Sequence, residues 1–172
     1  MGSLDGYSHK FFEKKEKLEP LHVDDTSIIA MADGELIDIN SVPDDMFSKK
    51  LMGETTAFDF GNDKVTICSP ANGTLSVLFP TAHAFGIQMN NGMELLVHIG
   101  INTVEANGDG FKVLNVKQGD AVKAGQPIVE VDFKKLSKTY NTNTMLIITN
   151  NLDRPASFTE PKSVKRGDVV LK

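Results

Sequence analysis

The stretch TAHAFGIQMNNGMELLVHIGINTVE, residues 81–105, consists of two apolar runs on either side of an Asn-Asn-Gly turn signal. Apolar runs flanking such a turn predict a β-hairpin. Each run contains one histidine, His83 in the first and His98 in the second, among apolar neighbours. A hairpin of this length brings the two imidazoles to neighbouring positions on one sheet. Because histidine is neutral and nucleophilic near physiological pH, the stretch predicts a two-histidine site on a β scaffold.

Short β-type runs continue along the chain from Ser27 onward, with glycine-containing turns between them. This pattern is typical of an all-β sandwich or barrel. Only residues 43–52 and 132–140 look helical, each for at most about two turns. We therefore predict an all-β, antiparallel β-sandwich with few short helical turns. The expected strands are SIIAMA (27–32), ELIDI (35–39), TAFDF (56–60), KVTICS (64–69), TLSVLF (74–79), GIQM (86–89), ELLVHIGI (94–101), FKVLNV (111–116), PIVEV (127–131), MLIIT (145–149) and DVVLK (168–172).

Two weak internal repeats divide these runs into similar halves. ADGELIDI at 32–39 is echoed by ANGTLSVL at 71–78, and VKQGDAVKAGQ at 116–126 by VKRGDVVLK at 164–172. The repeats predict two similar motifs packed face to face. The Gly-Asp turn also occurs in lipoyl and biotinyl carrier domains, so it indicates a related hybrid motif and reports architecture more than activity.

Length and composition predict one soluble domain. A chain of 172 residues can bury a sizeable core, and its net charge of −5 without a basic stripe argues against nucleic acid as a partner. No apolar stretch approaches the roughly 20 residues of a membrane-spanning helix, and the start does not resemble a signal peptide. The single cysteine, Cys68, excludes an intramolecular disulfide and is expected in the core, so we expect a cytoplasmic protein.

The first residues read as a separate segment. We expect a flexible N-terminal segment over 1–22 and the domain over 23–172. Within the segment, HKFFEKKEKLEP (9–20) could form a short helix with an apolar side, which would give at most peripheral contact with a membrane or a partner.

Several longer motifs occur in one order over most of the chain, from about Ile28 to the C-terminus. The motifs are VPDDMF (42–47), SPANGTL (69–75), TAHAF (81–85), VHIGINTVE (97–105), GDGFKVL (108–114) and GDAVKAGQPIVEVD (119–132). With them, the chain resembles the IIA component of the glucose class of the bacterial phosphoenolpyruvate-dependent sugar phosphotransferase system.

The resemblance implies a phosphotransferase component that carries a covalent phosphohistidine and needs no other cofactor. His98 would accept a phosphoryl group on Nε2 from phospho-HPr and pass it to a cysteine of a IIB domain during sugar uptake. His83 would hydrogen-bond the phosphoryl oxygens without being phosphorylated. The hydroxyl of Thr81 would orient His83, and the backbone carbonyl of Gly100 would hold the Nδ1 proton of His98.

Transfer of this kind needs alignment and charge stabilisation rather than a general base, because a neutral imidazole already offers a lone pair. An apolar collar around the histidines would exclude water and also serve as the docking surface for partner proteins. The candidates for this collar are Met46, Phe47, Phe79, Phe85, Leu96, Ile99 and Val104.

Two other functions remain open at this point. The same surface could belong to a regulatory module that docks enzymes or transporters and is switched by phosphorylation of His98. His83 and His98 could also bind zinc with a ligand from a partner, although the sequence shows no intrinsic metal site.

Five positions depart from the family pattern. Thr55 and Thr56 replace a glycine-containing turn. Asn102 stands where an aspartate is common, Asp45 where an apolar residue is usual, and Met145 where a proline precedes the strand 145–149. None removes a phosphoryl-transfer group, but they leave the cognate sugar open.

Overall fold

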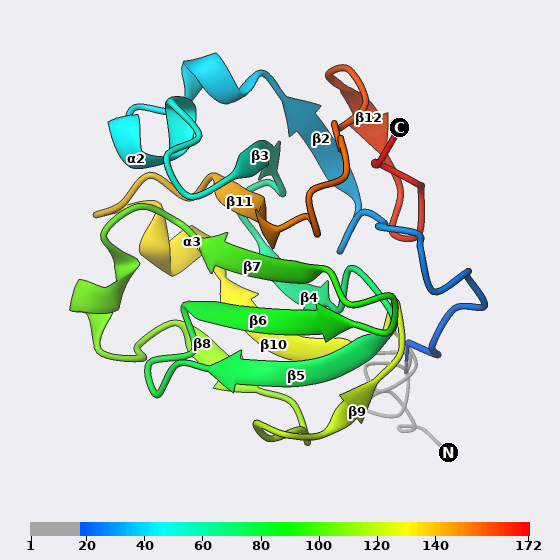
Figure 1. Cartoon of the computed structure of the whole chain (residues 1–172). Coiled ribbons are helices and arrows are strands. Elements are labelled where there is room, and N and C mark those ends of the chain that lie inside the picture. Colours follow the sequence, from blue (N-terminus) through cyan, green and yellow to red (C-terminus); the bar gives the residue numbers. More distant parts are fainter. Residues whose placement is uncertain (1–17) are drawn as a thin grey trace.

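Antiparallel strands make up most of the fold (Figure 1). The computed structural model describes residues 18–172. The strands are β2 (Gly34–Ile37), β3 (Glu54–Asp59), β4 (Lys64–Cys68), β5 (Gly73–Leu78), β6 (Ala84–Met89), β7 (Glu94–Ile99), β8 (Phe111–Val113), β9 (Ala121–Val122), β10 (Pro127–Asp132), β11 (Thr144–Asn150) and β12 (Lys162–Val164). Short helical turns are η1 (Ile39–Ser41), α2 (Asp45–Ser48), η2 (Thr103–Ala106) and α3 (Phe133–Leu136).

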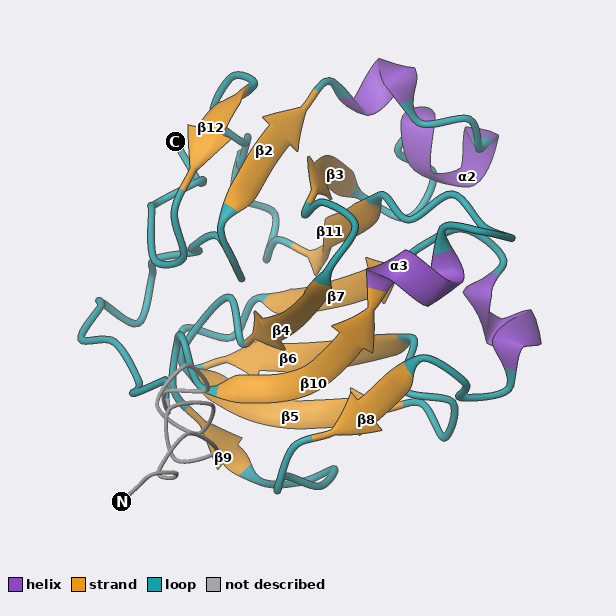
Figure 2. Ribbon diagram, turned by 180° about the vertical axis from the view of Figure 1, so that it is seen from behind, coloured by secondary structure: helices purple, strands orange, loops and turns teal. Residues whose placement is uncertain are grey.

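The strands form two sheets that face each other. The larger has the order β12-β2-β3-β11-β7-β6-β5-β9, and the smaller has the order β4-β10-β8. Figure 2 shows the small sheet lying across β5, β6 and β7 of the large one. The main core lies between them and includes Phe85 and Ile87 from β6 and Ile128 and Val131 from β10, all fully buried. The predicted antiparallel β-sandwich is confirmed.

The large sheet is also covered on part of its outer face. There a second apolar cluster joins Val42 and Phe47, from the segment around η1 and α2, to Ala57 of β3 and to Met145 and Ile147 of β11. Leu146 and Ile148, which alternate with Met145 and Ile147 along the strand, point to the main core. Strand β11 is therefore buried on both faces, which explains why its sequence is a continuous apolar run rather than an alternating one.

The repeat seen in the sequence is also a repeat in structure. The amide of Lys117 donates to Asp120 Oδ2 at 3.0 Å, and the amide of Lys165 donates to Asp168 Oδ2 at 2.8 Å. The glycine of each turn has a left-handed φ, 99° in the first and 98° in the second. The two Lys-x-Gly-Asp segments thus form the same turn, closed by the same aspartate.

Several element predictions need adjustment. The two helical segments are confirmed at α2 and α3, but each is only one turn long. The expected strands at 27–32 and 168–172 are reduced to the isolated bridge Ile29–Val169. Two hydrogen bonds flank it, from the amide of Ala30 to the carbonyl of Asp168 at 2.8 Å and from the amide of Val170 to the carbonyl of Ile28 at 2.9 Å. Strands β9 and β12 were not expected, since each is short and follows or precedes a turn signal.

The N-terminal segment is held to the domain where the structure describes it. The amide of Leu21 donates to the carbonyl of Ala124 at 2.8 Å, and Arg166 Nη1 donates to the carbonyl of Glu19 at 3.3 Å. Residues 18–22 are therefore anchored rather than free, and the rest of the expected segment, with most of its helix, lies outside the described residues. Within 18–172, no helix is both long and apolar enough to cross a membrane.

The matched turns predict matched losses of stability. Asp120→Ala and Asp168→Ala should each lower the free energy of unfolding by about 1 kcal/mol, because each removes one turn-closing hydrogen bond. Urea unfolding followed by circular dichroism measures both. Lys117→Ala is the control, since its amide still donates to Asp120. A loss confined to one aspartate would contradict the equivalence of the two turns.

Candidate functional site

The predicted hairpin is formed by β6 and β7, with Ala84 directly opposite His98. The connecting turn contains Gly92 at φ 96°, and the amide of Gly92 donates to the carbonyl of Met89 at 2.9 Å. Beyond β6, the amide of Ile99 donates to the carbonyl of His83 at 2.7 Å. The pairing therefore continues to the position of the first histidine.

The structure brings the two predicted histidines together. The ring centroids of His83 and His98 lie 5.1 Å apart, with the ring planes at 82°. His83 is only 3% exposed, whereas His98 is partly exposed. One imidazole is therefore accessible at the surface and the other stands edge-to-face beside it.

The hydrogen bond of His98 determines its tautomer. His98 Nδ1 lies 2.8 Å from the carbonyl oxygen of Gly100. Because a carbonyl oxygen only accepts, Nδ1 must carry the proton. Nε2 of the neutral ring is then left with a free lone pair, which makes it the nucleophilic atom.

The hydrogen bond of His83 is of a different kind. His83 Nδ1 lies 2.7 Å from Thr81 Oγ1. A hydroxyl can donate as well as accept, so Thr81 can donate to Nδ1 and leave the ring proton on Nε2. In that tautomer His83 offers an N–H donor beside the nucleophile of His98.

Burial keeps both rings neutral. Burial and, to a smaller extent, the neighbouring His98 together lower the pKa of His83 to about 4. Burial also lowers the pKa of His98, while the hydrogen bond to Gly100 and the negative charge of Asp44 oppose that shift. Neutral imidazole is the form that has an unprotonated ring nitrogen, so His98 is available as a nucleophile at neutral pH.

Left-handed backbone conformations lie close to both histidines in the sequence. Ala82, which precedes His83, has a left-handed φ of 61°, a conformation that costs a non-glycine residue about 1 kcal/mol or more. Gly100 has φ 79°, and a Cβ atom there would collide with Cγ2 of the fully buried Thr103. The carbonyl that binds His98 thus belongs to a residue that must be glycine.

Aromatic rings flank the pair. The ring centroid of Phe47 lies 5.0 Å from that of His98, and the ring of Phe79 meets His83 edge-on at 5.2 Å. Phe79 is 39% exposed, but Phe47 is only 6% exposed because it packs into the outer apolar cluster. The ring of Phe47 therefore packs against His98 as a buried residue, whereas the ring of Phe79 packs against His83 and is partly exposed.

The structure exposes some of the predicted collar residues and buries others. Met46 and Val104 are 48% and 50% exposed, and Leu96 is partly buried against the outer cluster. Phe85 and Ile99 are fully buried in the main core and cannot contact a partner. Both face the small sheet: side chains alternate along a strand, so Ile99 points away from the face that carries His98.

Two residues near the histidines, Asp44 and Val77, were not predicted from the sequence as part of this site. Asp44 caps α2 by accepting from the amide of Met46 at 2.9 Å and acts electrostatically on His98. A Pro-Asp-Asp sequence before a helical run is an N-cap signal that could have pointed to it. Val77 is 41% exposed and lies on the same sheet face as Gly86, which is two residues from Ala84.

Three of the departures from the family pattern are Asn102, Asp45 and Met145. Asn102 is exposed with φ 63°, a conformation that asparagine tolerates. Asp45 forms a surface ion pair with Lys49 at 3.3 Å. Met145 pairs directly with His98 across β11 and β7 and is fully buried, so it forms part of the floor under the histidine.

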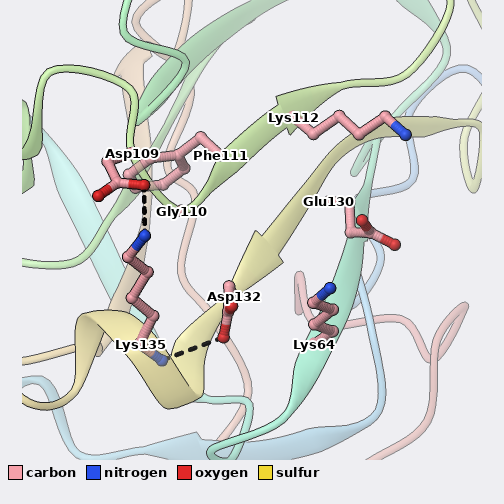
Figure 3. A pocket seen from close by; sticks show the side chains of 8 residues that line it. All are labelled: Lys64, Asp109, Gly110, Phe111, Lys112, Glu130, Asp132 and Lys135. Atoms are coloured by element: carbon pink, nitrogen blue, oxygen red, sulfur yellow. Dashed lines mark hydrogen bonds and ion pairs between the residues drawn. The ribbon is translucent and has the colours of Figure 1, made fainter.

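Two surface hollows lie away from the histidines, and neither is lined by His83 or His98. A cleft of about 270 Å³ is lined by residues of opposite charge around β10, with Lys135 bonded to Asp109 at 2.6 Å (Figure 3). A second hollow of about 510 Å³ lies beside β9 and residues 21–25. Cys68 is fully buried, and burial raises the pKa of its thiol to about 11, as expected for a core residue. Among the described residues, no group of three or more His, Cys, Asp or Glu could hold a metal ion.

Comparison with known proteins identifies the family. The family model of the phosphoenolpyruvate-dependent sugar phosphotransferase system, EIIA 1, matches residues 26–154. The chain belongs to this family. The resemblance inferred from its motifs is thereby confirmed.

The individual relatives are glucose-specific. The chain is 37% identical over 149 residues to the glucose-specific EIIA component of Staphylococcus aureus (strain COL), covering 87% of this chain and 86% of that protein. It is 36% identical to the glucose-specific EIICBA component of Staphylococcus saprophyticus, covering 92% of this chain but only 24% of that protein. The chain thus spans about a quarter of that longer relative. A solved structure, glucose permease IIA from Mycoplasma capricolum, is 36% identical with a TM-score of 0.78 over 84% of this chain and 93% of that one.

The lowered pKa of His83 predicts a pH dependence of stability. The folded protein holds His83 neutral down to about pH 4, whereas an unfolded histidine takes up a proton near 6.5. The unfolded state therefore binds more protons in this window, and stability falls as the pH falls from about 6.5 to 4, by up to about 3 kcal/mol.

Urea unfolding across this window measures the effect, and His83→Gln is the comparison. The free energy of unfolding of the variant should depend less steeply on pH. The difference in slope should correspond to at most one proton taken up on unfolding. An identical slope in the two proteins would show that His83 does not carry the shift.

Proposed function

We propose that the chain is a cytoplasmic phosphocarrier of glucose-class sugar uptake. It accepts a phosphoryl group from phospho-HPr on Nε2 of His98 and passes it to a cysteine of a IIB domain. The observation that carries this proposal is the hydrogen bond between His98 Nδ1 and the Gly100 carbonyl, because it leaves Nε2 unprotonated. The fused EIICBA relative, which by its name joins an EIIA to other components of the system, supports a IIB partner.

The transfer is a displacement at phosphorus. The lone pair of His98 Nε2 forms the new P–N bond while the P–N bond to the histidine of HPr breaks, and the released imidazole keeps the electron pair. In the second step the thiolate of the IIB cysteine forms a P–S bond and His98 leaves neutral. Such steps need positioning and charge stabilisation, and no proton must be removed from His98 Nε2.

His83 acts as the donor to the phosphoryl oxygens. Its ring lies edge-to-face with His98 at 5.1 Å between centroids, and Thr81 can donate to its Nδ1 so that the ring proton stays on Nε2. A positioned donor of this kind stabilises the charge of the transferring group.

The exposed apolar side chains around the histidines form the docking surface, which consists of Met46, Val77, Phe79 and Val104. An exposed apolar patch around a polar centre is typical of a protein–protein contact. Once covered by a partner, it would exclude water from the phosphohistidine and slow its hydrolysis.

A second role rests on the same surface. Phosphorylation would place a charge of about −2 in the middle of the docking surface, which would weaken the binding of an apolar partner. Regulated enzymes or transporters could therefore bind the unmodified form selectively. Titrating a candidate partner against both forms decides this: equal affinity for the two would rule out the switch.

No cofactor is needed for the carrier reaction besides the covalent phosphohistidine. His83 and His98 supply two imidazoles, and a closed zinc site needs four ligands. Zinc would therefore bind here only adventitiously or between molecules, with a ligand from a partner protein.

The first test of the carrier role is peptide mass spectrometry after incubation with phosphoenolpyruvate, enzyme I and HPr. We expect one acid-labile phosphoryl group on the peptide that contains His98, and none in His98→Gln. Wild-type protein that stays unmodified while HPr is charged would contradict the proposal.

The role of His83 is tested separately. His83→Gln should still accept a phosphoryl group on His98 but pass it to a IIB domain about a hundredfold more slowly, because a transition-state donor is lost. Rapid-quench measurement of the single transfer step gives this rate. Normal transfer by the variant would show that His83 is not the donor.

A further inference from the structure

The loop Asn141–Asn143, directly before β11, holds the backbone on both sides of Gly100. The amide of Gly100 donates to the carbonyl of Asn143 at 2.9 Å, and the amide of Ile101 donates to the carbonyl of Asn141 at 2.9 Å. The loop itself is closed by its first side chain, since Asn141 Oδ1 accepts from the amide of Asn143 at 2.9 Å. This is an Asx-turn, a geometry that asparagine forms readily.

One of these bonds fixes the direction of the carbonyl that binds His98. The carbonyl of Gly100 and the amide of Ile101 belong to the same peptide unit, which is trans, so the two groups point in opposite directions. Holding the Ile101 amide on Asn141 therefore aims the Gly100 oxygen at His98 Nδ1, 2.8 Å away. The imidazole itself makes none of these loop contacts.

Without this restraint the peptide unit could rotate. Gly100 has φ 79° and no side chain, so the plane that follows it meets a low steric barrier. A rotated unit would present the Ile101 amide to His98 Nδ1, which would then have to accept. The ring proton would move to Nε2, and the nucleophilic lone pair would be lost.

We propose that Asn141 is a positioning residue that, through the Asx-turn of residues 141–143, holds the Gly100–Ile101 peptide unit and thereby the Nδ1–H tautomer of His98. The inference deepens the proposed carrier function, on which its kinetic consequence rests. Its structural consequence concerns the unphosphorylated protein alone.

The test is Asn141→Ala, read first by ¹⁵N NMR of the His98 ring in the unphosphorylated protein. In the wild type, we expect a protonated Nδ1 and an unprotonated Nε2. In the variant, the fraction with protonated Nε2 should rise, and the rate of phosphorylation by phospho-HPr should fall about five-fold, as expected for one lost hydrogen bond.

Two further variants separate positioning from a general disturbance of the loop. Asn141→Asp keeps the Oδ1 acceptor and should restore the wild-type tautomer. Thr142→Ala is the matched control, because the Thr142 side chain takes no part in these bonds. Asn141 is exposed, so all three variants are expected to fold, which thermal unfolding checks.

The outcomes are distinct from those of the proposed function. An unchanged His98 tautomer in Asn141→Ala overturns the inference, and so does an equal change in Thr142→Ala. If phospho-HPr fails to modify even the wild type, the carrier function is wrong, while the tautomer measurement still decides whether Asn141 positions the peptide unit.

Discussion

The hydrogen bond from His98 Nδ1 to the Gly100 carbonyl is the contact on which the chemistry of this site depends. Either ring nitrogen of a neutral histidine can carry the proton, and this hydrogen bond places it on Nδ1. Its acceptor is a backbone atom, so the position of the acceptor depends on the conformation of the chain after β7. That conformation requires glycine at position 100.

The rest of the fold serves to support this short segment. Strand β7 lies between β6 and β11 in the large sheet, so its backbone is paired on both sides up to His98 and Ile99. The outer apolar cluster then places Phe47 against the imidazole, with 5.0 Å between the ring centroids. Because close-packed interiors resist displacement, this packing helps to hold the ring in place.

Sequence reasoning predicted the all-β sandwich, the hairpin and the meeting of the two histidines, because strong alternation and turn residues are local signals. It also predicted the repeated turns, which share one aspartate-closed geometry. The prediction of exposed collar residues failed where exposure depends on which face of a strand carries the side chain. Phe85 and Ile99 are neighbours of the histidines in sequence but point into the main core.

Contacts between distant segments were also beyond the sequence signal. Nothing local in residues 141–143 indicates that their carbonyls bind the chain beside Gly100, some forty residues earlier. Asp44 was missed as a charge near His98 for the same reason, since α2 reaches the histidine only through the packing of Phe47. The role of Asp44 as a helix cap can be predicted from its neighbours in the sequence, whereas its effect on His98 depends on how the chain folds.

The central claim is that the backbone makes Nε2 of His98 the nucleophile, and ³¹P–¹⁵N NMR of the phosphorylated, ¹⁵N-labelled protein tests it most directly. The account predicts one phosphorus resonance coupled to Nε2 of His98, with Nδ1 still protonated. Phosphorus bound to Nδ1 of His98, or to either nitrogen of His83, would contradict it.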